Sequence, residues 1–267
     1  MARIPDSEQT IEMMVNCKTY PAVSKKYVET VCTGGVQADG QFVRLYPVPF
    51  RFLDAEEQYK RWDVVRVRVY RDTKDKRPES WHLMAGTPIE VVTNVSTDRR
   101  RWDWMRKTVH TSTEVMSEKG ITNGCVEIEP LELYWESDSR EWTTSQLAVI
   151  KQGDLFATKE QLEGISERVP WQFRLKFREK HSGREDDSKV LAWSYYQGFR
   201  RAVKQSNEQA ALNTVADRIR ASIFNPDKTV FAIFGTHSRF GHWMISALYH
   251  VPTEIIEADS RKGSRLF

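Results

Sequence analysis

The residues in this chain whose types and spacing first point to chemistry are arginine and aromatic side chains that alternate along two short segments. Residues 41–48 read QFVRLYPV and residues 63–71 read DVVRVRVYR, so each segment offers one apolar face and one face of arginines and rings. Rings stack on bases and guanidinium groups bind phosphates, which is the surface chemistry that single-stranded nucleic acid requires. We predict a nucleic-acid-binding platform that contains Arg44, Tyr46, Arg66, Arg68 and Tyr70.

A solvated sheet face, or one covered by a helix, is the alternative interpretation of the same residues. Arginine and tyrosine are ordinary on such a face because their stems cover apolar surface while their polar ends stay in water. The sequence leaves both interpretations open.

Three further basic clusters extend the prediction. A polar loop follows residues 63–71, and residues 171–178, WQFRLKFR, repeat the alternation of basic and apolar side chains. The expected helix that begins DRRRWDWMRK at residue 98 groups arginines around tryptophan, which can hold phosphates while the ring stacks. An ordinary amphipathic helix with its tryptophans in the core explains that pattern equally well. These clusters add the following residues to the predicted set: Arg77, Arg99, Arg100, Arg101, Trp102, Arg174 and Lys176.

A loop near the C-terminus carries residues for a second kind of chemistry. Residues 235–242, GTHSRFGH, lie between two expected strands and are bracketed by glycines. His237 and His242 could act as acid and base on a phosphodiester while Arg239 holds the phosphate. The loop therefore predicts one alternative function, a phosphodiesterase or nuclease. A third possibility is a protein-interaction subunit that binds no nucleic acid and uses its tryptophans as anchors.

The sequence predicts no metal site and no cofactor. Glu127 and Glu129 fall on one face of an expected strand, and such pairs hold Mg²⁺ in nucleases, but the further acidic and lysine residues of those sites are missing from this stretch. The three cysteines form no CxxC pair. We also find no P-loop, dinucleotide glycine fingerprint, nucleophile elbow or zinc-ligand spacing.

Composition places the chain among water-soluble proteins with a local concentration of charge. Charged residues make up 29% of the 267 residues, yet the net charge is only +3, so a nucleic-acid partner requires cations gathered at one place. Apolar runs are too short for a membrane span, and MARIPDSEQT lacks the apolar core of a signal peptide. We expect a cytoplasmic protein with reduced thiols and no membrane partner.

The elements that must position these residues follow from the apolar pattern. Two apolar runs flank Ala38-Asp39-Gly40, and Asp-Gly between such runs predicts a tight hairpin because glycine accepts a positive φ. Residues 188–204 and 207–224 carry apolar side chains at helical spacing.

These patterns predict an α+β fold, with a twisted, mainly antiparallel sheet or small open β-barrel and a C-terminal helical hairpin packed on it. We expect a single domain over residues 1–252, with a subdivision near residues 152–170 as the alternative. Residues 253–267 are expected to form a flexible basic tail.

Two stretches carry a resemblance to other proteins. VCTGG followed by GQFVRLYPVPFR, and the later FGTHSRFGHWMISALY, are similar to a scattered group of uncharacterised prokaryotic and mobile-element proteins. The resemblance implies that both ends of the chain belong to one fold and suggests a defence or mobile-element context. It implies no activity and assigns no catalytic or binding residue.

Overall fold

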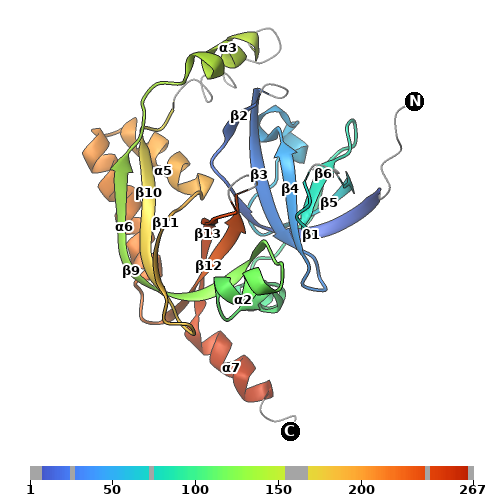
Figure 1. Cartoon of the computed structure of the whole chain (residues 1–267), viewed down its shortest axis with the longest axis vertical. Coiled ribbons are helices and arrows are strands. Elements are labelled where there is room, and N and C mark those ends of the chain that lie inside the picture. The colour runs from blue at the N-terminus through green and yellow to red at the C-terminus, as the bar shows by residue number, and fades with distance from the viewer. Residues whose placement is uncertain (1–7, 25–27, 72–74, 154–167, 238–240, 264–267) are drawn as a thin grey trace.

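A computed structural model describes residues 8–24, 28–71, 75–153, 168–237 and 241–263. Over these residues the chain folds into a β-barrel, a second β-sheet and α-helices, which confirms the predicted α+β class. Figure 1 shows the barrel and the second sheet side by side, with the N-terminal strands in the barrel. In the described part of the chain, no helix is both long enough and apolar enough to cross a membrane.

Five strands close the barrel. Their order is β1 (Gln9–Lys18), β3 (Val28–Val36), β4 (Phe42–Val48), β6 (Ser80–Leu83) and β5 (Asp63–Tyr70), and β5 pairs back onto β1. The barrel is therefore closed, whereas the sequence predicted an open one or a twisted sheet. The predicted hairpin joins β3 to β4, and Gly40 adopts a φ of 97° in its turn. Two short strands, β2 (Ala22–Ser24) and β7 (Glu90–Asn94), pair with β3 and β5.

Apolar side chains fill the interior of the barrel, because every second side chain of a strand points inward. The valines of β5 and apolar side chains of β1 and β4 meet in one buried cluster. Its strand members include Ile11, Met13, Val15, Val43, Leu45, Val65, Val67 and Val69. Tyr59, which is 1% exposed, joins this cluster from the loop before β5.

The second sheet has the order β11, β10, β9, β12, β13, with β8 (Val109–His110) beside β9. These strands are β9 (Asn123–Ser137), β10 (Trp171–Glu179), β11 (Glu185–Lys189), β12 (Lys228–Thr236) and β13 (Trp243–Pro252). The predicted helical hairpin consists of α5 (Trp193–Val203) and α6 (Glu208–Ile223), and it packs on this sheet. Asn207 caps α6 by accepting a hydrogen bond from the Ala210 amide at 2.9 Å.

The remaining helices lie at the edges. They are α1 (Asp98–Met105), α2 (Thr113–Glu118), α3 (Thr144–Gly153) and α7 (Thr253–Gly263), and short 3₁₀ turns occur at Phe50–Phe52 and Ala55–Glu57. Helix α7 occupies the segment that the sequence predicted as a flexible tail. Residues 154–167, within the predicted subdivision, lie outside the described residues. The extent of the domain stays a prediction.

Candidate functional site

The predicted Arg/aromatic platform is not one open surface. Strand β6 separates β4 from β5 in the barrel wall, and Arg44 points away from the barrel interior into the second sheet. Arg44 is only 5% exposed, and its guanidinium donates to the carbonyl oxygens of Thr236 at 3.1 Å and Thr122 at 3.0 Å. Arg44 therefore joins the barrel to the second sheet and does not lie beside Arg66.

The outward arginines of β5 are held by carboxylates from neighbouring strands. Arg66 contacts Glu12 and Glu90, each with a hydrogen bond of 2.7 Å, and Arg68 lies 3.6 Å from Glu8. These pairs neutralise the charge that the platform was expected to offer. Of its predicted rings, Tyr70 contacts the ring of His82 at 5.4 Å, and Tyr46 is 40% exposed.

Arg77 also has a structural partner. It forms an ion pair with Asp75 at 2.6 Å and donates to the Thr236 carbonyl at 2.9 Å, close to the bond from Arg44. Burial of Asp75 acts against ionisation, but hydrogen bonds from Arg77 prevail and lower the Asp75 pKa to about 2.

The arginine–tryptophan cluster of α1 contacts α7. Trp102 is 6% exposed, and its Nε1 donates to Asp259 at 3.3 Å. Arg99 and Arg106 bind the same carboxylate at 3.1 and 3.2 Å. Arg101 donates to the Val95 carbonyl, and Arg100 is exposed. Helix α1 is thus an amphipathic helix with Trp102 in the core, the second of the two interpretations of its sequence. The Asp259 carboxylate takes the place at these arginines where we predicted a phosphate.

We expect Asp259→Asn to lower the free energy of unfolding by about 1–2 kcal/mol, because two arginines lose the anion that they share. Chemical denaturation of the variant and the wild type measures the difference. Asp217→Asn, at an exposed pair with Arg220, is the control and should change stability by less than about 0.5 kcal/mol. Equal stability of the Asp259 variant and the wild type would contradict this role.

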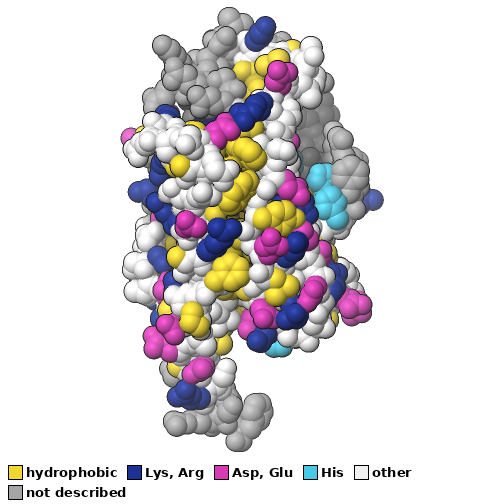
Figure 2. Space-filling model, turned by 90° about the vertical axis from the view of Figure 1, so that its left-hand side faces the viewer, with side chains coloured by type: hydrophobic (Ala, Val, Ile, Leu, Met, Phe, Trp, Pro, Cys, Tyr) yellow, Lys and Arg dark blue, Asp and Glu magenta, His cyan; other side chains and the backbone are white. Residues whose placement is uncertain are grey.

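Arg174 and Lys176 lie on the outer face of the second sheet among acidic side chains. Arg174 contacts Asp187 at 3.1 Å, and Lys176 contacts Glu132 at 2.6 Å. The next cation on the strand, Arg178, bridges Glu129 and Glu185. Figure 2 shows basic and acidic side chains mixed around hydrophobic ones on this side of the molecule, without a continuous basic area.

The histidine loop is only partly described. The rings of His237 and His242 stack with their centroids 5.5 Å apart, and the His237 amide donates to the His242 carbonyl at 3.1 Å. Arg239 lies outside the described residues, so the catalytic role of His237, Arg239 and His242 stays a prediction. In the described ranges, no three His, Cys, Asp or Glu side chains gather in a way that could hold a metal ion.

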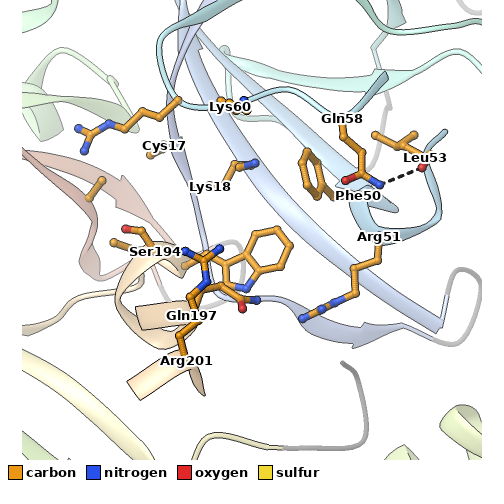
Figure 3. Close-up of a pocket in the computed structure, with 14 residues that line it drawn as sticks. Cys17, Lys18, Phe50, Arg51, Leu53, Gln58, Lys60, Ser194, Gln197 and Arg201 are labelled. Carbon is orange, nitrogen blue, oxygen red and sulfur yellow. Dashed lines mark hydrogen bonds between the residues drawn. The ribbon is translucent and has the colours of Figure 1, made fainter. Parts of the chain in front are cut away.

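Cations gather instead in a cavity of about 870 Å³ where the barrel meets helix α5 (Figure 3). We call it the basic pocket. Five of its lining residues are cationic: Lys18, Arg51, Lys60, Arg61 and Arg201. The described lining residues include no Asp or Glu, although the chain has 37 acidic residues. Such a site favours a negatively charged ligand.

Lys18 is a half-buried cation of the pocket. Its Nζ donates to the Tyr59 carbonyl at 2.8 Å and lies 3.6 Å from the centre of the Phe50 ring. Burial lowers the pKa of Lys18 from 10.5 to about 8, and the charge of Asp63 opposes that shift. The amine is therefore mainly charged at pH 7, without a carboxylate bonded to it.

Aromatic rings form one wall of the pocket. The Trp193 and Phe50 rings meet edge to face at 5.5 Å, and the Arg51 guanidinium lies 5.2 Å from the Trp193 ring while it pairs with Glu29 at 2.7 Å. Two buried donors of the lining, Trp193 Nε1 and Arg61 Nε, have no hydrogen-bond partner. Buried donors of this kind favour a ligand that brings acceptors.

Helix α5 adds its N-terminus to the same pocket. Ala192 precedes the helix without a side-chain cap, and the first two turns supply Trp193, Ser194 and Gln197 to the lining. The Tyr20 amide donates to the Leu191 carbonyl at 2.6 Å, so the segment that follows β1 holds the start of the helix against the barrel. Amide groups at a helix N-terminus favour anions, which agrees with the side-chain charge.

Sequence reasoning missed this pocket because its cations come from distant places in the chain. Lys18 ends a strand, Arg51 lies in a 3₁₀ turn, and Arg201 belongs to a helix. Lys18 and Arg51 stand in no basic run, and Arg201 has only Arg200 directly beside it. The dipeptide Arg61-Trp62 is the one place where a cation of the pocket adjoins a tryptophan in the sequence. Its significance shows only in the structure, where Trp62 has an unusual positive φ of 76° and its ring lies 4.4 Å from the Arg61 guanidinium.

Comparisons with known proteins add family matches without a function. Residues 9–111 match a family described as a domain of unknown function, DUF8758, and residues 109–267 match another, DUF8757. No curated protein matches the chain. One solved structure, titled "Structure of murine DNA binding protein bound with ds DNA", is similar at 8% identity and a TM-score of 0.33, over 91% of this chain and 96% of that one. The chain belongs to the family of domains of unknown function DUF8757.

Proposed function

We propose that this protein binds nucleic acid and that an unpaired nucleotide of the strand enters the basic pocket. The observation that carries the proposal is the composition of the pocket, whose described lining has five cations, two aromatic rings and no carboxylate. We thus still propose nucleic-acid binding, but we place its site at the junction of the barrel and α5 and not on the outward faces of the strands.

The chemistry of a nucleotide matches each part of the pocket. A phosphate is an anion for Lys60 and Arg201, which are exposed at the rim and form no ion pair in the described part of the chain. A base offers ring nitrogen and carbonyl acceptors to the unpartnered Trp193 Nε1 and Arg61 Nε. A volume of about 870 Å³ lies within the range of about 300–1,000 Å³ that is usual for small-ligand sites.

We expect Arg201→Gln to weaken binding of a single-stranded oligonucleotide by about tenfold, because one charge-assisted contact to phosphate is lost. The slope of the logarithm of the binding constant against the logarithm of salt concentration should fall by about 0.7. Fluorescence anisotropy at several salt concentrations, with DNA and with RNA, measures both quantities.

The matched control for Arg201→Gln is Arg68→Gln. Arg68 is also an exposed arginine, but it lies near Glu8 on the far side of the barrel wall, so its loss should change affinity by less than about twofold. If Arg68→Gln weakens binding more than Arg201→Gln does, the nucleic acid binds on the outward face of β5 and the proposed role of the basic pocket is wrong.

The same samples test the two alternative functions. Shortened strands on a denaturing gel, abolished by His237→Ala, would favour the phosphodiesterase. Absence of binding to both DNA and RNA would remove our proposal and leave a protein-interaction subunit. The defence or mobile-element context is likewise a proposal, and it rests on the resemblance of the two end segments.

A further inference from the structure

A second cavity, of about 530 Å³, lies between α5, α6 and β13. Its lining is mixed: Val215, Ile219 and Leu248 form an apolar wall, while side chains such as Arg218 and His250 add polar groups. As in the basic pocket, the described lining contains no Asp or Glu. The cavity therefore offers an apolar surface together with positive charge.

The two cavities share a wall. Arg61, Ser194 and Arg201 line both of them, so the cavities lie beside each other along α5. The shared wall contains two arginines. Arg61 donates to the Leu248 carbonyl at 2.9 Å and keeps its buried Nε without a partner, and Arg201 is exposed without an ion pair among the described residues. A ligand that spans both cavities must pass these two cations.

Arg218 gives the second cavity a cation of its own. It lies on the exposed side of α6, one position after Asp217, but Asp217 pairs with Arg220 at 3.3 Å and not with Arg218. No carboxylate in the described ranges forms an ion pair with Arg218. Its charge is thus available at the rim of the second cavity.

The order along this surface is a pocket for a ring, two shared cations, a second cavity with an apolar wall, and another cation. A nucleic-acid strand repeats in the same order, since each base is followed by a phosphate and then by the next base. A single nucleotide would occupy the basic pocket and leave Arg218 without a ligand group.

We infer that the second cavity binds the nucleotide next to the one in the basic pocket, and that Arg201 holds the phosphate that joins them. This inference rests on the proposed function and makes it more specific: the ligand is a strand with at least two consecutive unpaired nucleotides. The neighbouring base packs on the apolar wall of α6, and Arg218 contacts its outer phosphate.

Competition against a labelled oligonucleotide tests the inference with 5′-phosphorylated mononucleotides and with dinucleotides that carry the same 5′ phosphate. The wild type should bind the dinucleotide about tenfold more tightly than the better of its two component mononucleotides. Arg218→Gln should reduce dinucleotide affinity by about fivefold and leave mononucleotide affinity unchanged. Lys204→Gln is the matched control, because Lys204 is an exposed cation at the end of α5 that lines neither cavity, and it should change neither affinity.

The outcomes separate this inference from the proposed function. Equal affinity of the wild type for mononucleotide and dinucleotide would overturn the second subsite while the basic pocket stands. An Arg218→Gln variant that weakens both ligands equally would also overturn it, because Arg218 would then belong to the first subsite. Failure of the labelled oligonucleotide itself to bind would refute the proposed function and this inference together.

Discussion

Replacing Lys18 with methionine should raise the free energy of unfolding by about 3 kcal/mol at pH 7. Burial lowers the pKa of Lys18 from 10.5 to about 8, so keeping the amine charged in the folded protein costs about that free energy. Methionine fills a similar volume without a charge, and replacement of a buried charge by an apolar side chain is often stabilising. Urea denaturation of the two proteins measures the change.

The pH dependence of this effect has a definite sign. Between pH 8 and 10.5 the unfolded chain holds a proton on Lys18 that the folded protein has released, so the stability of the wild type rises with pH in this window. The advantage of Lys18→Met should shrink across the window and vanish above it. Lys60→Met, at an exposed cation of the same pocket, should give no such gain. A Lys18→Met protein that is less stable than the wild type at pH 7 would show that the amine stabilises the fold.

The same Lys18→Met variant should bind nucleic acid more weakly than the wild type, because the pocket loses a positive charge. Higher stability together with weaker binding is the behaviour expected of a residue kept for function at a cost in stability. Unchanged binding would exclude Lys18 from the ligand site.

Replacing Trp193 with leucine should lower the free energy of unfolding by about 2–3 kcal/mol and weaken oligonucleotide binding by about tenfold or more. Trp193 is 7% exposed and packs against Phe50, so a smaller side chain leaves a cavity. Binding suffers because the indole wall and the Nε1 donor are lost and because Arg51 no longer rests on the ring. Denaturation and anisotropy measure the two effects separately.

Two further variants keep this prediction testable. Trp193→Phe retains an aromatic wall but has no indole donor, so it should fold better than Trp193→Leu and bind more weakly than the wild type. Trp135→Leu removes a partly buried tryptophan from the second sheet, outside both cavities, and should reduce stability without changing affinity. If Trp193→Leu and the wild type bind the oligonucleotide with equal affinity, the Trp193 ring does not contact the nucleic acid.

Local signals in the sequence were sufficient for much of the fold. Alternating valines placed β5 because burial of one barrel face requires a period of two, and Asp39-Gly40 placed the hairpin because glycine supplies the positive φ. The apolar spacing of residues 207–224 likewise predicted helix α6. Closure of the barrel was not predictable in this way, since it depends on the pairing of β1 with β5 across the intervening strands.

The site was harder to predict because ion pairs are set by strand register. Arg66 lies 54 positions from Glu12 and 24 from Glu90, and nothing near Arg66 in the sequence announces either partner. A basic face in one strand therefore became a neutral ladder in the sheet. The cations of the basic pocket show the opposite behaviour. Lys18 and Arg201 lie far apart in the sequence and come together only where the end of β1 meets α5.

Photocrosslinking is the most direct test of the central claim that a nucleotide enters the basic pocket. A single-stranded oligonucleotide that contains 5-bromouracil is irradiated with the wild-type protein, and the linked peptide is identified by mass spectrometry. We expect crosslinks to Trp193 or Phe50, because these rings form the wall that a base would contact. Crosslinks confined to Tyr46 and Tyr70, on the outer side of the barrel, would contradict it and restore the strand platform as the site.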